Sequence, residues 1–362
     1  MPKVRVGVIG VGNCFSGLIQ GLEYYKRKGE VEYGLMKDKI GKYSIFDVDF
    51  VSAFDVDANK VGKKLSEAIY TAPNCVNWVK DVSLGKDVIV KESPLLDGIG
   101  VYLASLVKPK KQSKSVNQLR EEILEELRSS RTEVLLNYLP VGAQKATEFW
   151  ASIALEAKCG FVNCIPVFIA SNKKWAKKFE KEKVPIIGDD IKSQIGATIV
   201  HRTLTKLCVD RGAKIKRTYQ INVGGNTDFL NMLERKRLES KKVSKTEAVR
   251  SLIPGGIEDE NIYVGPSDFI PFLGNTKLAF IRIEGVMFAD VPFSIELRLE
   301  VDDKANSAGV AIDAVRYCKL ALDRNIGGPL IGPSAWLMKH PPVFYSDEEA
   351  RKLAEDFEKG LP

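Results

Sequence analysis

Apolar and polar positions along the first 190 residues follow two periods in turn, one typical of buried strands and one typical of helices. A β-branched apolar run at 4–9 predicts a strand, and an apolar helix is expected from about Phe15. Further strands are expected at 50–57, 160–166 and 184–187, a buried strand and turn at 133–142, and helices at 60–69, 116–128 and 143–157. Strands that alternate with helices in this way predict an α/β fold with a doubly wound parallel sheet of the Rossmann type.

The pattern changes after about residue 200. Residues 219–223 are strand-like, and 279–285 and 291–301 alternate as antiparallel strands do. The stretches 264–268 and 273–277 have the composition of turns, and a long apolar helix is expected at 310–323. This predicts a second, α+β domain whose sheet is suited to subunit contacts. The expected boundaries are 1–198 for the first domain, 199–304 for the second and 305–362 for a C-terminal segment.

Composition places the chain among ordinary globular proteins. It has 362 residues, of which 44% are hydrophobic and 28% charged, enough for about two domains. The start runs directly into the first strand without a leader-like segment, and no apolar stretch approaches the roughly 18–20 residues that cross a bilayer. A cytoplasmic protein with no membrane partner is therefore expected.

The six cysteines include no C-x-x-C pair, and the chain has only two histidines. Neither a zinc site of usual spacing nor a disulfide framework is predicted. The net charge of +7 comes from widely spread lysines and arginines, which favours a phosphorylated metabolite over nucleic acid. With so few histidines, acid–base chemistry would fall to Lys, Asp, Glu, Tyr or a group of the substrate.

A glycine turn follows the first strand. Gly10 and Gly12 allow a tight turn and close approach to a pyrophosphate at the helix that follows, although the third glycine, Gly17, comes two residues late. Asp55 ends the second strand and would bind the ribose hydroxyls, which favours NAD over NADP. Asp55 lies 43 residues after Gly12 rather than about 20, so 24–47 must be an insertion. The alternative is an ordinary turn aspartate.

The stretch 188–198 reads Gly-Asp-Asp-Ile-Lys-Ser-Gln-Ile-Gly-Ala-Thr, between a strand-like run and a helical run that continues through Leu207. Two carboxylates, an ammonium and a hydroxyl are thus predicted in one strand-to-helix turn. Free amides and the helix dipole at such a turn favour an anion. The alternative is a helix start capped by Asp and Ser.

A lysine-dense segment lies at 239–246. Lys241 and Lys245 are four residues apart, so on a helix both ammonium groups face the same way. On a surface the two would repel each other, whereas as a clamp they would hold a phosphate.

Several stretches, in order over nearly the whole chain, resemble inositol-3-phosphate synthases (myo-inositol-1-phosphate synthases) of the compact prokaryotic type. They are 10–13 (Gly-Val-Gly-Asn), 53–57 (Ala-Phe-Asp-Val-Asp), 138–142 (Tyr-Leu-Pro-Val-Gly), 188–193, 222–231 (Asn-Val-Gly-Gly-Asn-Thr-Asp-Phe-Leu-Asn) and 239–245 (Glu-Ser-Lys-Lys-Val-Ser-Lys). The resemblance implies a redox-neutral conversion of D-glucose 6-phosphate to 1D-myo-inositol 3-phosphate. A hydride passes from C5 to NAD, the C6 proton is removed, the enol attacks the C1 aldehyde, and the hydride returns to C5.

The resemblance also implies site residues. The implied catalytic residues are Lys241, Lys245, Lys277, Lys339, Asp190 and Asp303. The implied substrate-binding residues are Ser193, Asn226 and Lys192. The implied cofactor-binding residues are Gly10, Gly12, Asn13, Asp55, Asp57, Leu139, Pro140 and Asp190.

The resemblance assigns each lysine a role. Lys241 and Lys339 would move the proton of the C5 oxygen during both hydride steps. Lys245 and Lys277, with Ser193 and its neighbouring amides, would hold the phosphate, which is itself a candidate for removing the C6 proton.

Assembly and metal use are implied less fully. The second domain would be inserted into the Rossmann domain and build a homotetramer, with the C-terminal segment returning to the first domain. A divalent or monovalent cation is left open, with Asp303 or main-chain oxygens as donors. Asn275 stands where many relatives carry an acid, so any role of that acid is in doubt here.

Two other functions fit the residues. An NAD-dependent sugar-phosphate dehydrogenase would accumulate NADH, whereas the synthase would not. A sensor that binds NAD without turnover would need no phosphate-sugar pocket, so the widely separated lysines argue against it.

Overall fold

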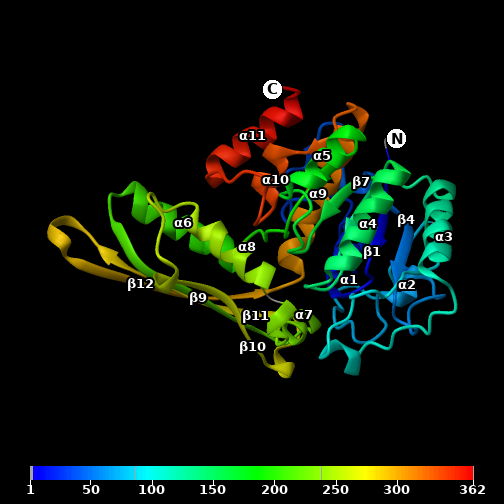
Figure 1. Ribbon diagram of the computed structural model, residues 1–362, viewed down its shortest axis with the longest axis horizontal. Helices are drawn as coiled ribbons and strands as arrows, with labels where there is room; N and C mark the ends of the chain where they lie inside the picture. The colour runs from blue at the N-terminus through cyan, green and yellow to red at the C-terminus, as the bar shows by residue number, and fades with distance from the viewer. Residues whose placement is uncertain (1–2, 86, 238, 362) are drawn as a thin grey trace.

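Two sheets organise the molecule (Figure 1). The computed structural model describes residues 3–85, 87–237 and 239–361. The larger sheet is parallel throughout. Its strand order is β13 (Gly328–Pro329), β8 (Pro185–Ile187), β7 (Gly160–Asn163), β6 (Val134–Asn137), β1 (Val4–Ile9), β4 (Val48–Asp55) and β5 (Lys91–Glu92). The central strands are buried apolar runs, as expected of a sheet that is covered on both faces.

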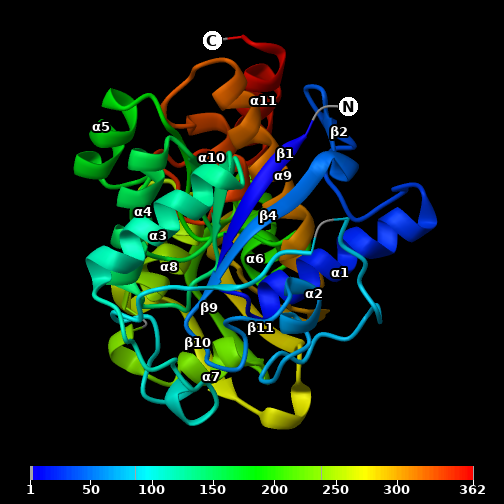
Figure 2. The same cartoon turned by 90° about the vertical axis from the view of Figure 1, so that its right-hand side faces the viewer.

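Helices cover both faces of the parallel sheet (Figure 2). On one face α1 (Asn13–Lys28) and α9 (Ala305–Asp323) share a core with apolar side chains of β1 and β4. On the other, α3 (Val116–Ser129), α4 (Gln144–Ala157) and α5 (Lys173–Lys181) pack with Trp150 and Phe161 at their centre. The predicted Rossmann-type sheet is confirmed.

Among the described residues the second sheet has four strands, all from the α+β part of the chain. Its strand order is β10 (Ile262–Phe269), β9 (Lys214–Gly224), β11 (Thr276–Val286) and β12 (Pro292–Asp302). Two helices, α6 (Ala197–Asp210) and α8 (Glu239–Arg250), contact one face of it. On the opposite face Tyr219, Tyr263 and Phe280 are 37–48% exposed, which leaves an aromatic surface in contact with water. The additional sheet predicted after residue 200 is therefore confirmed.

The chain crosses back to the parallel sheet after β12. Helix α9 follows directly and contacts β1, β6, β7 and β8. Beyond it β13 pairs with β8, and α10 (Ile331–Leu337) packs against α11 (Asp347–Lys359). In Figure 1 these C-terminal helices lie on the side of the parallel sheet and away from the tip of the second sheet. The domain boundaries given above stay a prediction.

Two local predictions are wrong. The helix expected at 60–69 is reduced to α2 (Leu65–Ala68), because the backbone of Gly62, Lys63 and Leu65 pairs with Val88 and Val90 instead. The turn expected at 264–268 is part of β10, which runs parallel to β9. Proline and glycine are tolerated there because β10 is an edge strand with an irregular register.

The expected insertion begins later than predicted, since α1 continues to Lys28. The loop that follows contains a short hairpin, β2 (Lys39–Ile40) and β3 (Tyr43–Ser44), before β4 begins. Helix α7 (Thr227–Asn231) begins three residues after β9 ends. Within the described residues, no helix combines the length and apolar character needed to span a bilayer.

Candidate active site

The glycine turn joins β1 to α1 at the carboxyl edge of the parallel sheet. Gly10 has a φ of 91°, and a Cβ there would come within 2.8 Å of the carbonyl oxygen of Tyr138. Gly12 is the N-cap of α1, and a Cβ there would meet nothing within 4 Å. The turn is therefore tight on its inner side and open at Gly12, where a phosphate could approach the helix N-terminus.

Asp55 holds this turn in place. Its Oδ2 accepts a hydrogen bond from the amide of Val11 at 2.7 Å, and its Oδ1 accepts from the amides of Val56 and Asp57 at 2.7 and 2.9 Å. Asp57 accepts through Oδ1 from the amide of Asn59 at 2.9 Å, while its buried Oδ2 has no hydrogen-bond partner among the described residues. Burial raises the pKa of Asp57. Asp57 thus keeps an uncommitted oxygen, whereas both oxygens of Asp55 are already used.

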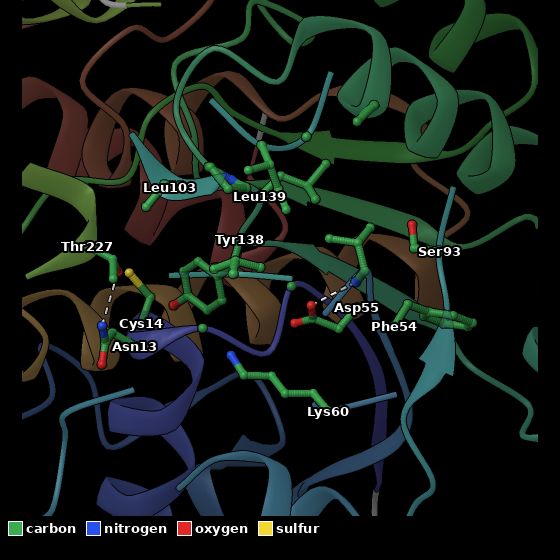
Figure 3. A pocket seen from close by; sticks show the side chains of 18 of the residues that line it. Asn13, Cys14, Phe54, Asp55, Lys60, Ser93, Leu103, Tyr138, Leu139 and Thr227 are labelled. Atoms are coloured by element: carbon green, nitrogen blue, oxygen red, sulfur yellow. Dashed lines mark hydrogen bonds between the residues drawn. The ribbon is translucent and has the colours of Figure 1, made fainter. Parts of the chain in front are cut away.

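A pocket lies over the glycine turn, and we call it the glycine-turn pocket (Figure 3). Of the predicted cofactor-binding residues it is lined by Gly10, Gly12, Asn13, Asp55, Leu139 and Pro140. Asp57 and Asp190 do not line it. Asn13 is fixed on both sides, because its Oδ1 accepts from the amide of Cys75 at 2.7 Å and its Nδ2 lies 3.2 Å from the hydroxyl of Thr227.

A second pocket, which we call the lysine pocket, collects the four predicted lysines from three parts of the fold. Lys241 and Lys245 come from α8, Lys277 from β11, and Lys339 follows α10. Asp190, Ser193 and Asp303 line the same pocket. The helical spacing of Lys241 and Lys245 is as predicted, and it places both side chains in one cavity.

Asp190 anchors one side of the lysine pocket. Lys339 donates to Asp190 Oδ1 at 3.1 Å and to the carbonyl oxygen of Ile191 at 2.6 Å, and the hydroxyl of Ser244 donates to Asp190 Oδ2 at 2.8 Å. Burial alone would raise the pKa of Asp190, but Lys339 and Lys241 bring it below its usual value. Burial lowers the pKa of Lys339. Asp190 is therefore a carboxylate that keeps one lysine oriented.

Asp303 anchors the other side. Its Oδ1 lies 3.2 Å from the ammonium of Lys277, and its Oδ2 lies 3.2 Å from both Asn226 Nδ2 and the ammonium of Lys304. Burial acts against the charged form, yet Lys277 and Lys304 hold the pKa of Asp303 well below its usual range. Asn226, a predicted substrate contact, donates to Asp303, which lines the pocket, but does not line the pocket itself. The Oδ1 of Asn226 caps α7 by accepting from the amide of Asp228 at 3.0 Å.

Lys245 is the exception among these charged groups. It is 4% exposed, and none of the described carboxylates lies within 4.0 Å of its ammonium. Burial, followed by repulsion from Lys277 and Lys241, lowers the pKa of Lys245 well below its ordinary value. A buried ammonium without a counter-ion is costly, so this position favours a ligand that brings negative charge.

Two predicted features of the stretch 188–198 are placed differently. Lys192 points away from the lysine pocket and donates to Asp347 Oδ1 at 3.0 Å and to the carbonyl oxygen of Ala335 at 2.8 Å. The amides of 189–192 and 194–195 are already bonded to residues 164–165, 306, 337 and 340. Helix α6 begins only at Ala197, so most amides before it are used within the fold, and an anion site at Ser193 and the start of α6 stays a prediction.

Asp189 is a structural residue. Its carboxylate accepts from Asn163 Nδ2 at 2.7 Å and from the amides of Ile169, Ala170 and Ser171, each at 3.1 Å. It thereby fixes the loop after β7 on which the lysine pocket rests. Burial raises the pKa of Asp189 to about 6.

Sequence reasoning missed three residues at the place where the two pockets meet. Cys14, Tyr138 and Asp228 line both pockets, as does Leu139. Lys304 was missed as well, although it follows Asp303 directly. Its side chain is 1% exposed, and its ammonium pairs with Asp228 and Asp303. Asp228 and Tyr138 both lie inside stretches that carry the family resemblance, which is the signal that could have drawn attention to them.

The fold and the site together define a Rossmann-type α/β protein in which a pocket over the glycine turn opens into a second pocket lined by lysines. Among the described residues, no group of three or more His, Cys, Asp and Glu side chains is arranged to hold a metal ion. Such an arrangement suits an anionic ligand next to a bound nucleotide.

Comparison with known proteins gives the family. A model of the family described as myo-inositol-1-phosphate synthase matches residues 196–304. The inositol-3-phosphate synthase of Mycolicibacterium smegmatis (strain ATCC 700084 / mc(2)155) is 51% identical over 99% of this chain and 98% of its own length. That of Corynebacterium glutamicum (strain ATCC 13032) is 48% identical over 98% of both.

A solved structure supports the fold. The crystal structure of a myo-inositol-1-phosphate synthase-related protein from Thermotoga maritima MSB8 superposes with a TM-score of 0.85 at 24% identity, and 99% of each chain is covered. The chain belongs to the myo-inositol-1-phosphate synthase family.

Proposed function

We propose that the two joined pockets convert D-glucose 6-phosphate to 1D-myo-inositol 3-phosphate, with NAD bound in the glycine-turn pocket and the sugar phosphate in the lysine pocket. Family membership places the chain among enzymes of the isomerase type. The observation that carries the proposal is that four lysines from three separate elements line a cavity that shares residues with the glycine-turn pocket.

The residues of the glycine turn fit a dinucleotide. Gly12 leaves the backbone open at the start of α1, where the pyrophosphate would lie, and Leu139 and Pro140 supply an apolar wall. Asp55, at the end of β4, lines the pocket where the ribose would lie, whereas Asp57 does not line it. NAD, when bound, would supply a reversible hydride acceptor next to the sugar.

The phosphate end of the substrate fits Lys245 and Lys277. Lys245 is buried, with no carboxylate within 4.0 Å in the part of the chain that the structure describes, and Lys277 shares Asp303 with Lys304. A phosphate dianion at Lys245 would provide the negative charge that this ammonium lacks. Ser193 lines the same cavity and would add a hydroxyl donor. The phosphate so held is itself a candidate to remove the C6 proton.

Proton movement at the C5 oxygen is assigned to Lys339 and Lys241. Asp190 orients Lys339, and burial lowers the pKa of Lys339, which brings this ammonium closer to a working acid and base near neutrality. Lys241 lies in the same cavity and would stabilise negative charge that develops on the sugar oxygens.

A cation at Asp303 does not fit this arrangement. Both carboxylate oxygens of Asp303 already accept from Lys277, Lys304 or Asn226. The side-chain oxygen of Asn275 is also occupied, since it accepts a hydrogen bond from the thiol of Cys75 at 3.4 Å. No step of the proposed reaction is therefore assigned to a cation.

The proposed assembly is a homotetramer built through the exposed face of the second sheet. Tyr219, Tyr263 and Phe280 on that face are each more than a third exposed. Light scattering after gel filtration would measure the mass in solution. We expect four copies for the unmodified chain and a smaller species for Tyr219→Lys, and an unmodified chain that elutes as a monomer would contradict the assembly.

Phosphorus NMR of the protein with glucose 6-phosphate and NAD tests the proposed function, with NADH absorbance followed in parallel. We expect an inositol phosphate resonance without lasting NADH. Lasting NADH with a keto or acid product would make the chain a sugar-phosphate dehydrogenase instead. Binding of NAD with unchanged substrate would favour the sensor. Lys241→Met should abolish the new resonance, whereas Lys242→Met, on the exposed side of α8, should not.

A further inference from the structure

Tyr138 lies at the carboxyl end of β6, directly beside the glycine turn. Its amide donates to the carbonyl oxygen of Ile9 at 2.9 Å, and the amide of Leu139 donates to Asn137 Oδ1 at 3.2 Å. The close approach of Gly10 to the Tyr138 carbonyl leaves no room for a side chain at Gly10. The backbone of Tyr138 is thus held in one position relative to the turn.

The side chain of Tyr138 lines both pockets. In Figure 3 its ring lies in the middle of the glycine-turn pocket, with the hydroxyl directed toward Cys14. The hydroxyl oxygen is buried and has no hydrogen-bond partner among the described residues. This hydroxyl is therefore an unused polar group at the place where the two pockets meet.

Two thiols act most directly on the Tyr138 hydroxyl, and the charged groups of Lys304 and Asp228 lie beyond one of them, at 3.5 and 3.7 Å from the Cys14 sulfur. The thiols of Cys14 and Cys164 are the titratable groups that act electrostatically on the Tyr138 hydroxyl. Burial raises the pKa of the Cys14 thiol to about 11 and that of the Cys164 thiol well above its usual value, so both thiols keep their protons. Leu139 and Ile165 supply the apolar part of this wall. The ammonium groups of the lysine pocket are suited to a charged phosphate. A neutral hydroxyl donor is suited instead to an uncharged oxygen.

Burial raises the pKa of Tyr138 well above its ordinary value, so the hydroxyl keeps its proton and is available as a donor. A buried hydroxyl without a partner is destabilising, and such groups are rare unless a ligand or a water satisfies them. Since no group among the described residues bonds to this hydroxyl, its position between the two pockets points to a bound ligand.

We propose that the Tyr138 hydroxyl donates a hydrogen bond to a carbonyl oxygen of the ligands that meet at the junction of the two pockets. This rests on the proposed function, in which hydride passes between cofactor and sugar at that junction. Two oxygens have this chemistry: the carboxamide oxygen of NAD and the C5 oxygen of the sugar, which becomes a carbonyl when C5 is oxidised. Either would satisfy the hydroxyl on binding.

Tyr138→Phe tests the proposal, because it removes only the hydroxyl. We expect the urea midpoint of the cofactor-free protein to be unchanged or higher, and kcat/KM for glucose 6-phosphate to fall about tenfold to a hundredfold. Calorimetric titration with NAD separates the two oxygens. A Kd raised about tenfold assigns the bond to the carboxamide, and an unchanged Kd with reduced kcat/KM assigns it to the sugar.

Tyr70→Phe is the matched control. The Tyr70 hydroxyl donates to the carbonyl oxygen of Val79 at 2.5 Å, away from both pockets, so its loss should lower the urea midpoint and leave kcat/KM unchanged. The proposal is overturned if Tyr138→Phe loses stability as Tyr70→Phe does, or if it changes neither kcat/KM nor the Kd for NAD.

These outcomes are separate from the fate of the proposed function. If the unmodified protein makes no inositol phosphate, the proposed function fails, and stability and NAD binding still decide the role of Tyr138. An unchanged urea midpoint with weaker NAD binding would then support it, and unchanged NAD binding would overturn it.

Discussion

The glycine-turn pocket and the lysine pocket treat buried charge in opposite ways. In the glycine-turn pocket, the carboxylate of Asp55 accepts hydrogen bonds from three backbone amides, so groups of the protein itself stabilise its charge. In the second, the ammonium of Lys245 is 4% exposed and has no carboxylate within 4.0 Å among the described residues. A charge that the fold already pairs can hold the site in shape, whereas a buried charge left without a partner favours a ligand of opposite charge.

The same difference appears inside the lysine pocket. Lys304 is buried between Asp228 and Asp303, and these carboxylates raise the pKa of Lys304 well above its usual value although burial opposes this. Lys245 is buried to a similar degree, and burial with its cationic neighbours lowers its pKa. Burial alone therefore does not decide whether a lysine is structural or functional. What differs between these two lysines is their partners, since Lys304 has two carboxylates and Lys245 has none within 4.0 Å among the described residues.

Removal of Lys304 should have the largest effect. Lys304→Met removes a buried ammonium from two carboxylates, those of Asp303 and Asp228, whose side chains are 17% and 34% exposed. Breaking a fully buried pair from one side costs about 3–5 kcal/mol of unfolding free energy, and because Asp228 is partly exposed we expect a loss at the lower end, about 3 kcal/mol. Urea unfolding followed by circular dichroism measures this loss. The double variant Lys304→Met/Asp228→Asn should recover part of it, since the second substitution removes the orphaned charge.

Lys42→Met serves as the control for Lys304. It breaks the exposed ion pair with Asp323, and such surface pairs contribute little to stability. If Lys304→Met unfolds at the same urea concentration as Lys42→Met, then Lys304 is not the structural lysine of this comparison.

Removal of Lys245 should act on catalysis and not on stability. Lys245→Met deletes a buried ammonium that has no carboxylate within 4.0 Å among the described residues, so the unfolding free energy should be unchanged or higher. If Lys245 holds the phosphate, kcat/KM for glucose 6-phosphate should fall about 10²- to 10³-fold, or roughly 3–4 kcal/mol. Steady-state kinetics on Lys245→Met and on the exposed Lys242→Met would measure this. A destabilised Lys245→Met with normal kinetics would reverse the assignment.

Asp55→Asn sharpens the comparison from the glycine-turn side. An amide can keep one of the oxygen contacts, but its NH₂ group would face a backbone N–H where the carboxylate now accepts. We expect a loss of about 2 kcal/mol in unfolding free energy, within the range for a buried donor left unpaired. NAD affinity should fall with it, because the turn at Val11 loosens. Unchanged stability would show that Asp55 is a free ligand and not a scaffold residue.

Much of this could be predicted from the sequence because it depends on local patterns. The alternation of strands and helices, the glycine turn and the spacing of Lys241 and Lys245 are short-range features, and the resemblance added Lys277 and Lys339 from distant parts of the chain. The errors were local as well. The turn at 264–268 became an edge strand because β9 offered a partner, which composition does not reveal.

What the sequence could not supply was the use of each polar group in three dimensions. Lys192 was predicted to help bind the substrate, yet its ammonium donates to Asp347, which lies 155 residues later at the N-terminal end of α11. The amides near Ser193 were predicted to be free, yet Asn306 accepts from two of them, those of Gln194 and Ile195, and its Nδ2 donates to the carbonyl of Ile195. Lys304 carries the same charge as the predicted lysines, and only its two carboxylate neighbours distinguish it.

The pH dependence of stability gives the smallest and most selective prediction, because it separates the two buried lysines without removing either. The folded-state pKa of Lys245 is lowered, so between that value and 10.5 the unfolded chain binds more protons, and the contribution of Lys245 to stability rises with pH. The folded-state pKa of Lys304 is raised, so its contribution is fully present below 10.5 and is lost only above that pH.

Between pH 8 and 9 the stability advantage of Lys245→Met over the unmodified protein should therefore shrink, by at most about 1.4 kcal/mol, whereas the deficit of Lys304→Met should stay constant. Urea titrations of the three proteins at both pH values would measure this. A parallel shift of all three would mean that Lys245 has a counter-ion in solution, and the contrast between the pockets would then be lost.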